Sequence, residues 1–346
     1  MLQNQPITVI GAGILGVWQA LELARAGHRV RLVEASAAAD PFAATASRYA
    51  GAMLAPDCEG EAAPDIVRQH GHFGLTLWRA TYPHLVEAGT LVLAQARDRS
   101  ELTRFARMTG GHTQLDGDAL RALEPDLAGR FVTGLFYAGE AHMETPAAMR
   151  FLLDAARQAG AEIALGQHVA DPAALDGIVV DCRGLGARDD IAGLRAVRGE
   201  RVVVRARDVS LARPVRLLHP RHPLYVVPWP GHVFMIGATV IESEDDGPAT
   251  VRSALELMGI AYALHPGFGE AEILELNAGL RPAYADNVPR VVVEQGGRIL
   301  RINGAYRHGF LLAPVLAGIV ANVLRDAAFV HPLLVSRSHE STFGLA

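Results

Sequence analysis

A glycine-rich segment near the N-terminus has the spacing of a dinucleotide-binding turn. Gly11, Gly13 and Gly16 follow the short apolar run 7–10. In such a turn the first glycine permits a sharp bend, the second lets the backbone approach a pyrophosphate, and the third lets the helix pack closely on the strand. The helix that begins here would add free N–H groups and a partial positive charge. The alternative is a glycine-rich turn without a ligand, and the flanking residues favour the ligand.

An acidic residue follows where a ribose would need one. Residues 17–26 carry apolar side chains at helical spacing, and the apolar run 30–33 ends at Glu34. Strand, turn, helix and strand together have the length of one βαβ unit. In this unit a carboxylate at the end of the second strand accepts hydrogen bonds from the ribose diol. Because Glu34 would repel a 2′-phosphate, the pattern disfavours NADP.

A second glycine-bearing turn, near the C-terminus, bears on whether the ligand is FAD or NAD. The strand expected at 298–302 leads through Gly304 and Gly309 into a helix expected at 313–325. A helix placed in this way could direct the positive end of its dipole at the flavin C2 carbonyl and N1, and so stabilise reduced flavin. An NAD dehydrogenase has no evident use for such a turn, although a purely structural turn is the other explanation. The pattern favours FAD.

The composition argues against several classes of protein. The chain has 346 residues and a net charge of −5, without the basic surface that a nucleic-acid partner would favour. Cys58 and Cys182 have neither the number nor the spacing of a disulfide framework or a zinc site, which fits a reducing, cytoplasmic setting. No apolar stretch resembles a signal peptide or reaches the ~20 residues of a membrane span, so we expect no stable membrane insertion. His70 and His72 have no supporting cluster of ligands, and we expect no metal.

The remaining pattern predicts further helices and strands. Residues 35–64 are expected to form an extended loop, and residues after Ala328 a loosely ordered tail. Thr145 is expected to cap the helix that follows it. The other helices are expected at 66–86, 100–108, 146–159 and 250–264, and the other strands at 161–165, 177–182, 201–205, 224–227 and 233–236.

This order of elements predicts an α/β protein with two domains. A nucleotide-binding domain is expected from residues 1–75, 136–198 and 276–328. A substrate domain built on an antiparallel sheet is expected from 76–135 and 199–275. The C-terminal tail is expected to cover 329–346.

Six segments resemble, in the same order, the thiamine-pathway glycine oxidases of the D-amino-acid oxidase family. These segments are 9–34, 50–56, 198–200, 224–228 with 237–239, 279–282, and 306–314. The resemblance implies a Rossmann-like FAD-binding domain of the glutathione-reductase-2 type with an inserted α+β substrate domain. It also implies noncovalent FAD, because neither cysteine lies near the final turn, where related sarcosine oxidases attach the flavin. A homo-oligomer is a further implication.

The glycine turn and the resemblance together indicate which residues contact FAD. Those expected at the adenosine and pyrophosphate are Gly11, Ala12, Gly13, Ile14, Leu15, Gly16, Glu34, Ala35 and, at the adenine, Val169. Those expected beside the flavin are Thr45, Ala46, Gly51, Ala52 and Met53, and at its pyrimidine end Gly304, Ala305, Tyr306, Arg307, His308, Gly309, Phe310 and Leu311.

The resemblance places Tyr225, Arg281 and Arg307 at the substrate carboxylate. A guanidinium fork is the natural anchor for a small amino acid, which offers few other contacts. Arg281 is expected in a turn bounded by glycine and proline, from which it could face the same cavity as Arg307. No general base is evident. If the amine binds neutral, a hydride can pass from Cα to flavin N5, with positioning and electrostatics carrying the catalysis. His308 is expected to pack locally instead of acting as a base.

The expected activity is FAD-dependent oxidative deamination of glycine or another small amino acid, giving a 2-oxo acid, ammonia and hydrogen peroxide. Molecular oxygen is the expected electron acceptor, and thiazole formation in thiamine biosynthesis the expected pathway. Three alternatives stay open at this point. They are a D-amino-acid dehydrogenase that reduces a quinone, a sarcosine-type secondary amine oxidase, and a flavin-binding protein that has lost catalysis.

Overall fold

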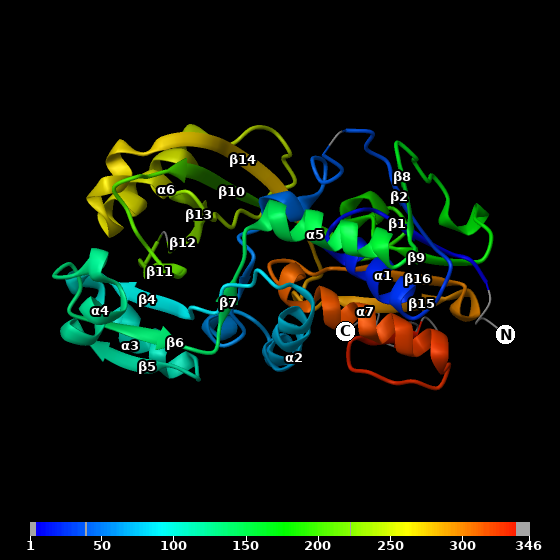
Figure 1. The fold of residues 1–346 in the computed structure, drawn as a ribbon, viewed down its shortest axis with the longest axis horizontal. Helices are drawn as coiled ribbons and strands as arrows, with labels where there is room; N and C mark the ends of the chain where they lie inside the picture. Colours follow the sequence, from blue (N-terminus) through cyan, green and yellow to red (C-terminus); the bar gives the residue numbers. More distant parts are fainter. Residues whose placement is uncertain (1–4, 39, 222, 337–346) are drawn as a thin grey trace.

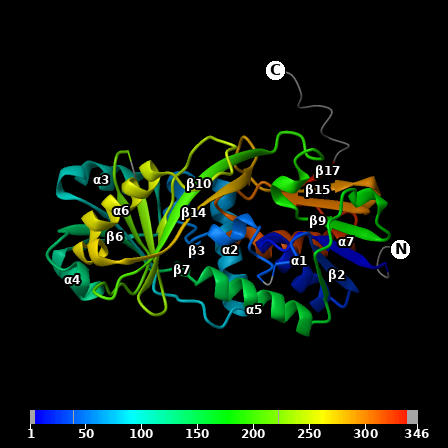
Figure 2. The same cartoon turned by 90° about the horizontal axis from the view of Figure 1, so that it is seen from above.

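Two large sheets form the two ends of the molecule (Figure 1). The structure is a computed structural model that describes residues 5–38, 40–221 and 223–336. Figure 2 shows the same arrangement from above, with helix α2 near the middle of the molecule. Within the described ranges, none of the helices is both long and apolar enough to cross a bilayer.

The seven-stranded sheet carries the N-terminal glycine turn. Its neighbouring strands run parallel, except for the antiparallel pair β15 and β16. In order across the sheet, the strands are β17 (Leu334–Ser336), β15 (Arg290–Glu294), β16 (Ile299–Asn303), β9 (Ile178–Asp181), β1 (Ile7–Ile10), β2 (Val30–Glu34) and β8 (Glu162–Leu165).

Three helices cover one face of this sheet. Side chains of α1 (Ile14–Arg25), α5 (Thr145–Gln158) and α7 (Gly309–Arg325) pack in one core with Ile7 and Val9 of β1. Residues that point to opposite faces alternate along a strand, so both faces of β1 must be apolar for it to lie centrally. This arrangement confirms the predicted Rossmann-like fold.

The eight-stranded sheet is mainly antiparallel, with one parallel pair, β11 and β4. In order, the strands are β14 (Glu272–Ala283), β10 (Arg195–Arg205), β13 (Val233–Gly237), β12 (Leu224–Trp229), β11 (Val215–Leu218), β4 (Thr90–Ala94), β6 (Thr133–Tyr137) and β5 (Thr113–Asp116). Helices α3 (Arg99–Met108), α4 (Gly117–Leu123) and α6 (Val251–Leu264) accompany it. A separate apolar cluster, made by Val203, Val227 and Met235, packs against Tyr225 and Met53. Met53 ends the segment 45–53, which was predicted to lie beside the flavin and is called the flavin loop below.

Short elements connect the two sheets. β3 (Met53–Leu54) pairs with β7 (Ala141–His142), and α2 (Asp65–Thr81) follows the flavin loop. The 3₁₀ turns are Ala46–Tyr49, Cys58–Glu61, Ala96–Asp98, Pro125–Leu127, Pro172–Ala174, Gly184–Ala187, Pro266–Glu270 and Gln295–Gly297.

A proline explains how α2 holds the start of α7. Pro314 lies inside α7 and has no N–H, so the carbonyl of Phe310 loses its helical partner. Trp78 of α2 replaces that partner, and its Nε1 donates to the Phe310 oxygen at 2.6 Å. Gly74 lets the helices approach, because a Cβ there would lie 2.0 Å from the Leu311 oxygen. The first turn of α7 is thus fixed from outside its own helix.

Several element ends differ from those predicted. α1 begins at Ile14 instead of 17, and α7 at Gly309 instead of 313. α2 ends at Thr81 instead of 86, since Pro83 disfavours a helical conformation in the residue before it. Thr145 was wrongly predicted as an N-cap: Glu144 occupies that position, and the Thr145 hydroxyl donates to the Ala50 oxygen at 2.6 Å.

The antiparallel sheet and the C-terminus are also more ordered than predicted. Strands β4, β5, β6, β11 and β14 were missed, and β10 begins at Arg195. Arg281 lies within β14, where it pairs with Val197 of β10, and not in a turn. The expected tail contains β17, which pairs with β15, whereas residues 337–346 lie outside the described ranges. The domain limits stay a prediction, and the limit expected between residues 75 and 76 falls inside α2.

Glu140 joins the second sheet to the segment that follows the flavin loop. It lies just before β7 and is 1 % exposed, and its Oε1 accepts from the N–H groups of Asp57 at 3.1 Å and Cys58 at 2.7 Å. Burial raises the pKa of this carboxyl to about 8. The folded protein therefore holds a proton there that the unfolded chain releases.

We expect replacement of Trp78 by phenylalanine to leave the Phe310 carbonyl without a donor. An unsatisfied buried acceptor costs about 1–3 kcal/mol, so Tm should fall. In Pro314→Ala the backbone N–H of residue 314 can donate to the Phe310 oxygen. In that background we therefore expect Trp78→Phe to lower Tm by less. Thermal unfolding of the four proteins of this cycle measures the coupling. Equal losses of Tm in both backgrounds would contradict the proposed exchange of donors.

The Glu140 carboxyl should give the protein a specific pH dependence. Because its folded pKa lies above the ordinary value of 4.5, stability should decline as pH rises from about 4.5 to 8, by at most ~1.4 kcal/mol per pH unit. Glu140→Gln keeps the acceptor oxygen but cannot titrate, so its Tm should decline less over this range. Glu270→Gln, at an exposed position, is the control. If Tm declined equally with pH in the wild type and in Glu140→Gln, the Glu140 carboxyl would not be the source of the pH dependence.

Candidate active site

A cavity of about 580 Å³ is lined by residues from both sheets, including both glycine-bearing turns. The predicted substrate anchors Tyr225 and Arg281 line it as well. The predicted cofactor residues that line it are Gly11, Gly13, Ile14, Leu15, Glu34, Ala35, Thr45, Ala46, Gly51, Ala52, Met53, Val169, Ala305, Tyr306, Arg307, His308, Gly309, Phe310 and Leu311. Ala12, Gly16 and Gly304 are not among the lining residues.

The first glycine turn brings strand and helix into close contact. A Cβ at Gly16 would lie 1.8 Å from the Gly11 oxygen, and Gly11 itself has a φ of +96°. α1 therefore starts directly above the end of β1. Ser47, which was not among the predicted cofactor residues, accepts from the Ile14 N–H through Oγ at 2.9 Å. No spacing rule links a loop serine to a helix start 33 residues away, so the sequence carried no signal for it.

Glu34 is held in place by backbone donors. Its carboxylate accepts from the N–H of Ala12 at 2.7 Å and from that of Ser36 at 3.0 Å. Ala12 thus orients Glu34 instead of facing the cavity. A carboxylate has about four acceptor sites, so acceptor capacity remains for a ribose diol.

The second glycine turn places the start of α7 at the same cavity. Gly304 has a φ of +76°, and a Cβ there would lie 2.1 Å from the Tyr284 ring, which explains why glycine is needed although it does not line the space. His308 is the N-cap residue of α7, but no side chain caps the helix start. Free N–H groups and the positive end of the helix dipole are therefore available there. The cavity thus has a glycine-rich turn at one end, which suits a pyrophosphate, and an uncapped helix start at the other, which suits reduced flavin. Both features fit FAD.

Arg281 reaches the cavity because two glycines make space on the neighbouring strands. A Cβ at Gly199 of β10 would lie 2.0 Å from Nη2 of Arg281. Gly279, opposite Gly199 in the ladder, leaves room in the same way for the ring of Tyr49. The guanidinium donates through Nη1 to the carbonyls of Arg198 at 3.3 Å and Thr239 at 3.1 Å. Burial lowers its pKa, and it makes no ion pair with the described carboxylates. It can therefore accept an incoming carboxylate.

Arg307 is ion-paired inside the protein. Its Nη2 lies 3.3 Å from both carboxylate oxygens of Glu59, which raises the pKa of Arg307. Burial alone would raise the pKa of Glu59, but Arg307 and Arg216 outweigh burial and hold it below its ordinary value. Glu59 was not predicted, because it lies in a loop without periodicity whose partners are distant in sequence.

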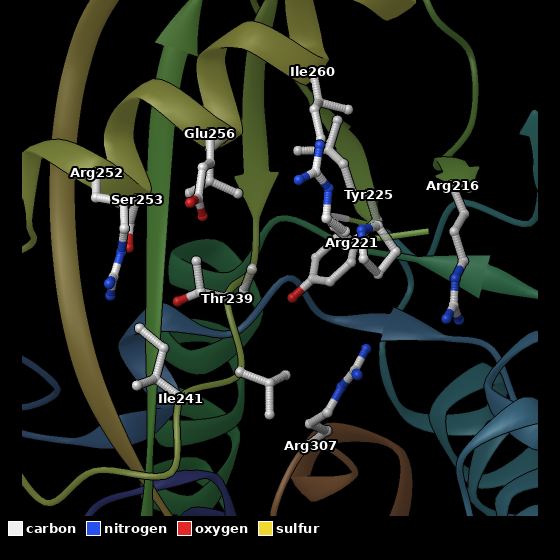
Figure 3. A pocket seen from close by; sticks show the side chains of 15 residues that line it. Arg216, Arg221, Tyr225, Thr239, Ile241, Arg252, Ser253, Glu256, Ile260 and Arg307 are labelled. Carbon is white, nitrogen blue, oxygen red and sulfur yellow. The ribbon is translucent and has the colours of Figure 1, made fainter. Parts of the chain in front are cut away.

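Tyr225 and Arg307 face a common space from different elements (Figure 3). Tyr225 extends from β12, and its register partner on β13 is Gly237. Gly51 of the flavin loop packs directly against it, since a Cβ at Gly51 would lie 3.0 Å from the Tyr225 ring. Thr239 borders the same space in this view.

Three histidines that the sequence brought to attention are uncharged or contact other side chains. Burial lowers the pKa of His308 to about 4, so it is uncharged near neutral pH. His72 lies 3.0 Å from Asp57, and the ring of His70 lies 4.6 Å from that of His331. Among the described residues, no group of three or more histidines, cysteines or acidic residues could hold a metal ion.

Arg201 is a further lining residue that the sequence did not indicate. Its guanidinium lies 5.4 Å from the Tyr49 ring centre and 6.0 Å from that of Trp229, and its Nη2 is 2.8 Å from Glu275. These contacts connect Tyr49 of the flavin loop to the eight-stranded sheet. The sequence did not indicate Arg201 because its position in the cavity depends on the pairing of β10 and β14, and short sequence patterns do not specify this pairing.

Comparison with known proteins agrees with this geometry. A protein of Rhizobium etli assigned to thiamine biosynthesis as the oxidoreductase ThiO is 50 % identical over 319 residues, which cover 92 % of this chain and 96 % of the relative. The glycine oxidase of Geobacillus kaustophilus is 28 % identical over 378 residues, covering 95 % and 96 %. The crystal structure of glycine oxidase from Bacillus cereus has the same fold, with a TM-score of 0.79 at 24 % identity over 95 % of this chain and 97 % of that one.

The profile of the family described as FAD dependent oxidoreductase, DAO, matches residues 6–323. This match covers most of the chain, including both glycine-bearing turns and all three predicted substrate anchors. The chain therefore belongs to the DAO family of FAD-dependent oxidoreductases.

Proposed function

We propose that this oxidoreductase catalyses the oxidative deamination of glycine or another small amino acid. The observation that carries the proposal is Arg281, a half-buried guanidinium without a carboxylate partner among the described residues, in the cavity that also contains both glycine-bearing turns. Such a group is suited to bind a carboxylate. The relation to ThiO and glycine oxidase supports the same substrate class and a place in thiamine biosynthesis.

In the proposed mechanism the side chains of this chain position the substrate. Arg281 would bind the α-carboxylate, Arg307 would add a second cation held by Glu59, and Tyr225 would donate a hydrogen bond. The neutral His308 would not compete for the carboxylate, and no residue is required to remove a proton from Cα. FAD, held by the predicted cofactor residues, would supply the hydride acceptor and the route by which electrons reach oxygen. The amino acid would leave as an imine, which water converts to a 2-oxo acid and ammonia, with hydrogen peroxide as the other product.

The finer assignments belong to the same proposal. We propose that FAD binds noncovalently through the predicted residues, and Cys58 and Cys182 are both buried. A cytoplasmic location and a homo-oligomer stay predictions. The quinone-reducing and sarcosine-type alternatives differ from the proposal in electron acceptor and in substrate, and both differences can be measured.

Anaerobic mixing of the holoenzyme with glycine, sarcosine and several D-amino acids tests the proposal. We expect glycine or another small primary amino acid to bleach the flavin absorbance, and air to restore it with formation of peroxide. Bleaching that persists in air but is reversed by a quinone would favour the dehydrogenase. A preference for sarcosine would favour the secondary amine oxidase. A flavin that none of these compounds reduces would refute the proposed function.

Gly199→Ala should weaken substrate binding without touching the substrate. The added Cβ would occupy the space of the Arg281 guanidinium, and losing a hydrogen bond to a charged group costs ~1.5–3 kcal/mol. We therefore expect KM for the amino acid to rise by about tenfold, and Arg281→Ala to have a larger effect. The flavin spectrum should be unchanged in both variants. Gly259→Ala is the matched control, because a Cβ there meets no atom within 4 Å. Normal KM in Gly199→Ala would argue against Arg281 as the anchor.

A further inference from the structure

A second cavity, of about 350 Å³, adjoins the proposed substrate site (Figure 3). It shares Tyr225, Ala238 and Arg307 with the larger cavity. Its volume corresponds to roughly ten water molecules at ~30 Å³ each. Glycine anchored at Arg281 and Arg307 would have no group to place there. The site therefore has room for a substituent that glycine lacks.

The charged side chains of this second cavity are mostly cationic. Arg221 lies in the loop before β12 and Arg252 in the first turn of α6, and neither makes an ion pair with a residue of the described ranges. Arg216, by contrast, pairs with Glu61 at 2.8 Å. Glu256 is the cavity's own acidic residue and is engaged in another interaction. Among the described residues, Arg221 and Arg252 are thus left without a carboxylate partner.

The rest of the wall suits a short aliphatic segment. Pro223, Leu257 and Ile260 contribute apolar surface to the wall of the second cavity. A ligand that spans both cavities would therefore meet Arg281 and Arg307 in the larger cavity, and apolar surface together with Arg221 and Arg252 in the second. Guanidinium groups bind carboxylates and phosphates through paired hydrogen bonds. The end of the ligand that enters the second cavity should therefore carry an acidic group.

We propose that this enzyme accepts amino acids that carry a second acidic group, and that this group enters the second cavity toward Arg221 and Arg252. The inference rests on the proposed function, since it uses Arg281 and Arg307 as the anchor for the α-carboxylate. The second acid is joined through one or two carbons, either to the amine nitrogen or to Cα. Glycine itself is then a small substrate that leaves the second cavity unused.

Binding can be tested without turnover. Oxydiacetate resembles a dicarboxylic secondary amine but has no nitrogen to oxidise, and its monoamide has the same shape with one charge fewer. Titration of the holoenzyme, followed by the change in flavin absorbance, gives both dissociation constants. We expect oxydiacetate to bind about tenfold more tightly than the monoamide, because hydrogen bonds to charged groups are the stronger kind. Added salt should reduce this ratio.

Single variants locate the effect. Arg221→Gln and Arg252→Gln should each lower the binding ratio of oxydiacetate to monoamide severalfold and leave kcat/KM for glycine unchanged. Arg207→Gln is the matched control, since Arg207 is 73 % exposed and pairs with Glu272 outside the cavity. Equal affinities for the two compounds in the wild type would overturn the inference. An unchanged ratio in both cavity variants would overturn it as well.

Flavin reduction then separates the inference from the function on which it rests. We expect N-(2-carboxyethyl)glycine or D-aspartate to reduce the flavin with a higher kcat/KM than its side-chain amide, and the better of the two acids shows whether nitrogen or Cα bears the second group. Reduction by glycine without any preference for the acids would refute the inference and leave the proposed function standing. Tight binding of oxydiacetate without reduction by any amine would refute the proposed function instead.

Discussion

Arg281 is half-buried with two backbone carbonyls as its acceptors, and this cation without a counter-ion among the described residues is the constraint that the substrate site must meet. Removing a cation from water without a counter-ion costs several kcal/mol, so the surrounding chain has to supply partial compensation. The carbonyls of Arg198 and Thr239 provide it, and glycine at position 199 provides the space. A carboxylate ligand would supply a counter-ion, so its binding would recover part of the free energy that the partial burial of this cation costs.

The two anchoring arginines differ in this respect. Arg307 already has a counter-ion in Glu59, whereas Arg281 has none among the described residues. If both were unpaired, their mutual repulsion would add to the cost of burial. If both were paired, neither would have much to gain from a substrate. The observed difference keeps Arg307 fixed and leaves Arg281 available. This arrangement allows a small acid to bind reversibly.

The sequence predicted the parts of the site that short-range chemistry determines. Glycine spacing after a strand requires a tight turn wherever it occurs, so the turn at Gly11–Gly16 and the acid at Glu34 could be read directly. The turn before α7 was found for the same reason, although the helix start was placed too late. These features depend on neighbours within about thirty residues.

What the sequence could not predict depends on strand pairing across long separations. β14 is a partly exposed edge strand without clear alternation, and its Gly-Leu-Arg-Pro stretch looked like a turn. Only the register that sets Gly199 opposite Gly279 explains why Arg281 can lie flat across β10. Glu59, Ser47, Arg221 and Arg252 belong to loops, short turns or helix ends whose partners are unrelated in sequence position.

The exchange of hydrogen-bond donors at Phe310 has an evolutionary consequence. A proline within α7 makes the chain dependent on an indole more than two hundred residues away, so neither position is free to change alone. Relatives that have lost this proline should tolerate phenylalanine or leucine at the tryptophan position, while relatives that retain it should not. The two residues would then vary together across the family although neither contacts the substrate.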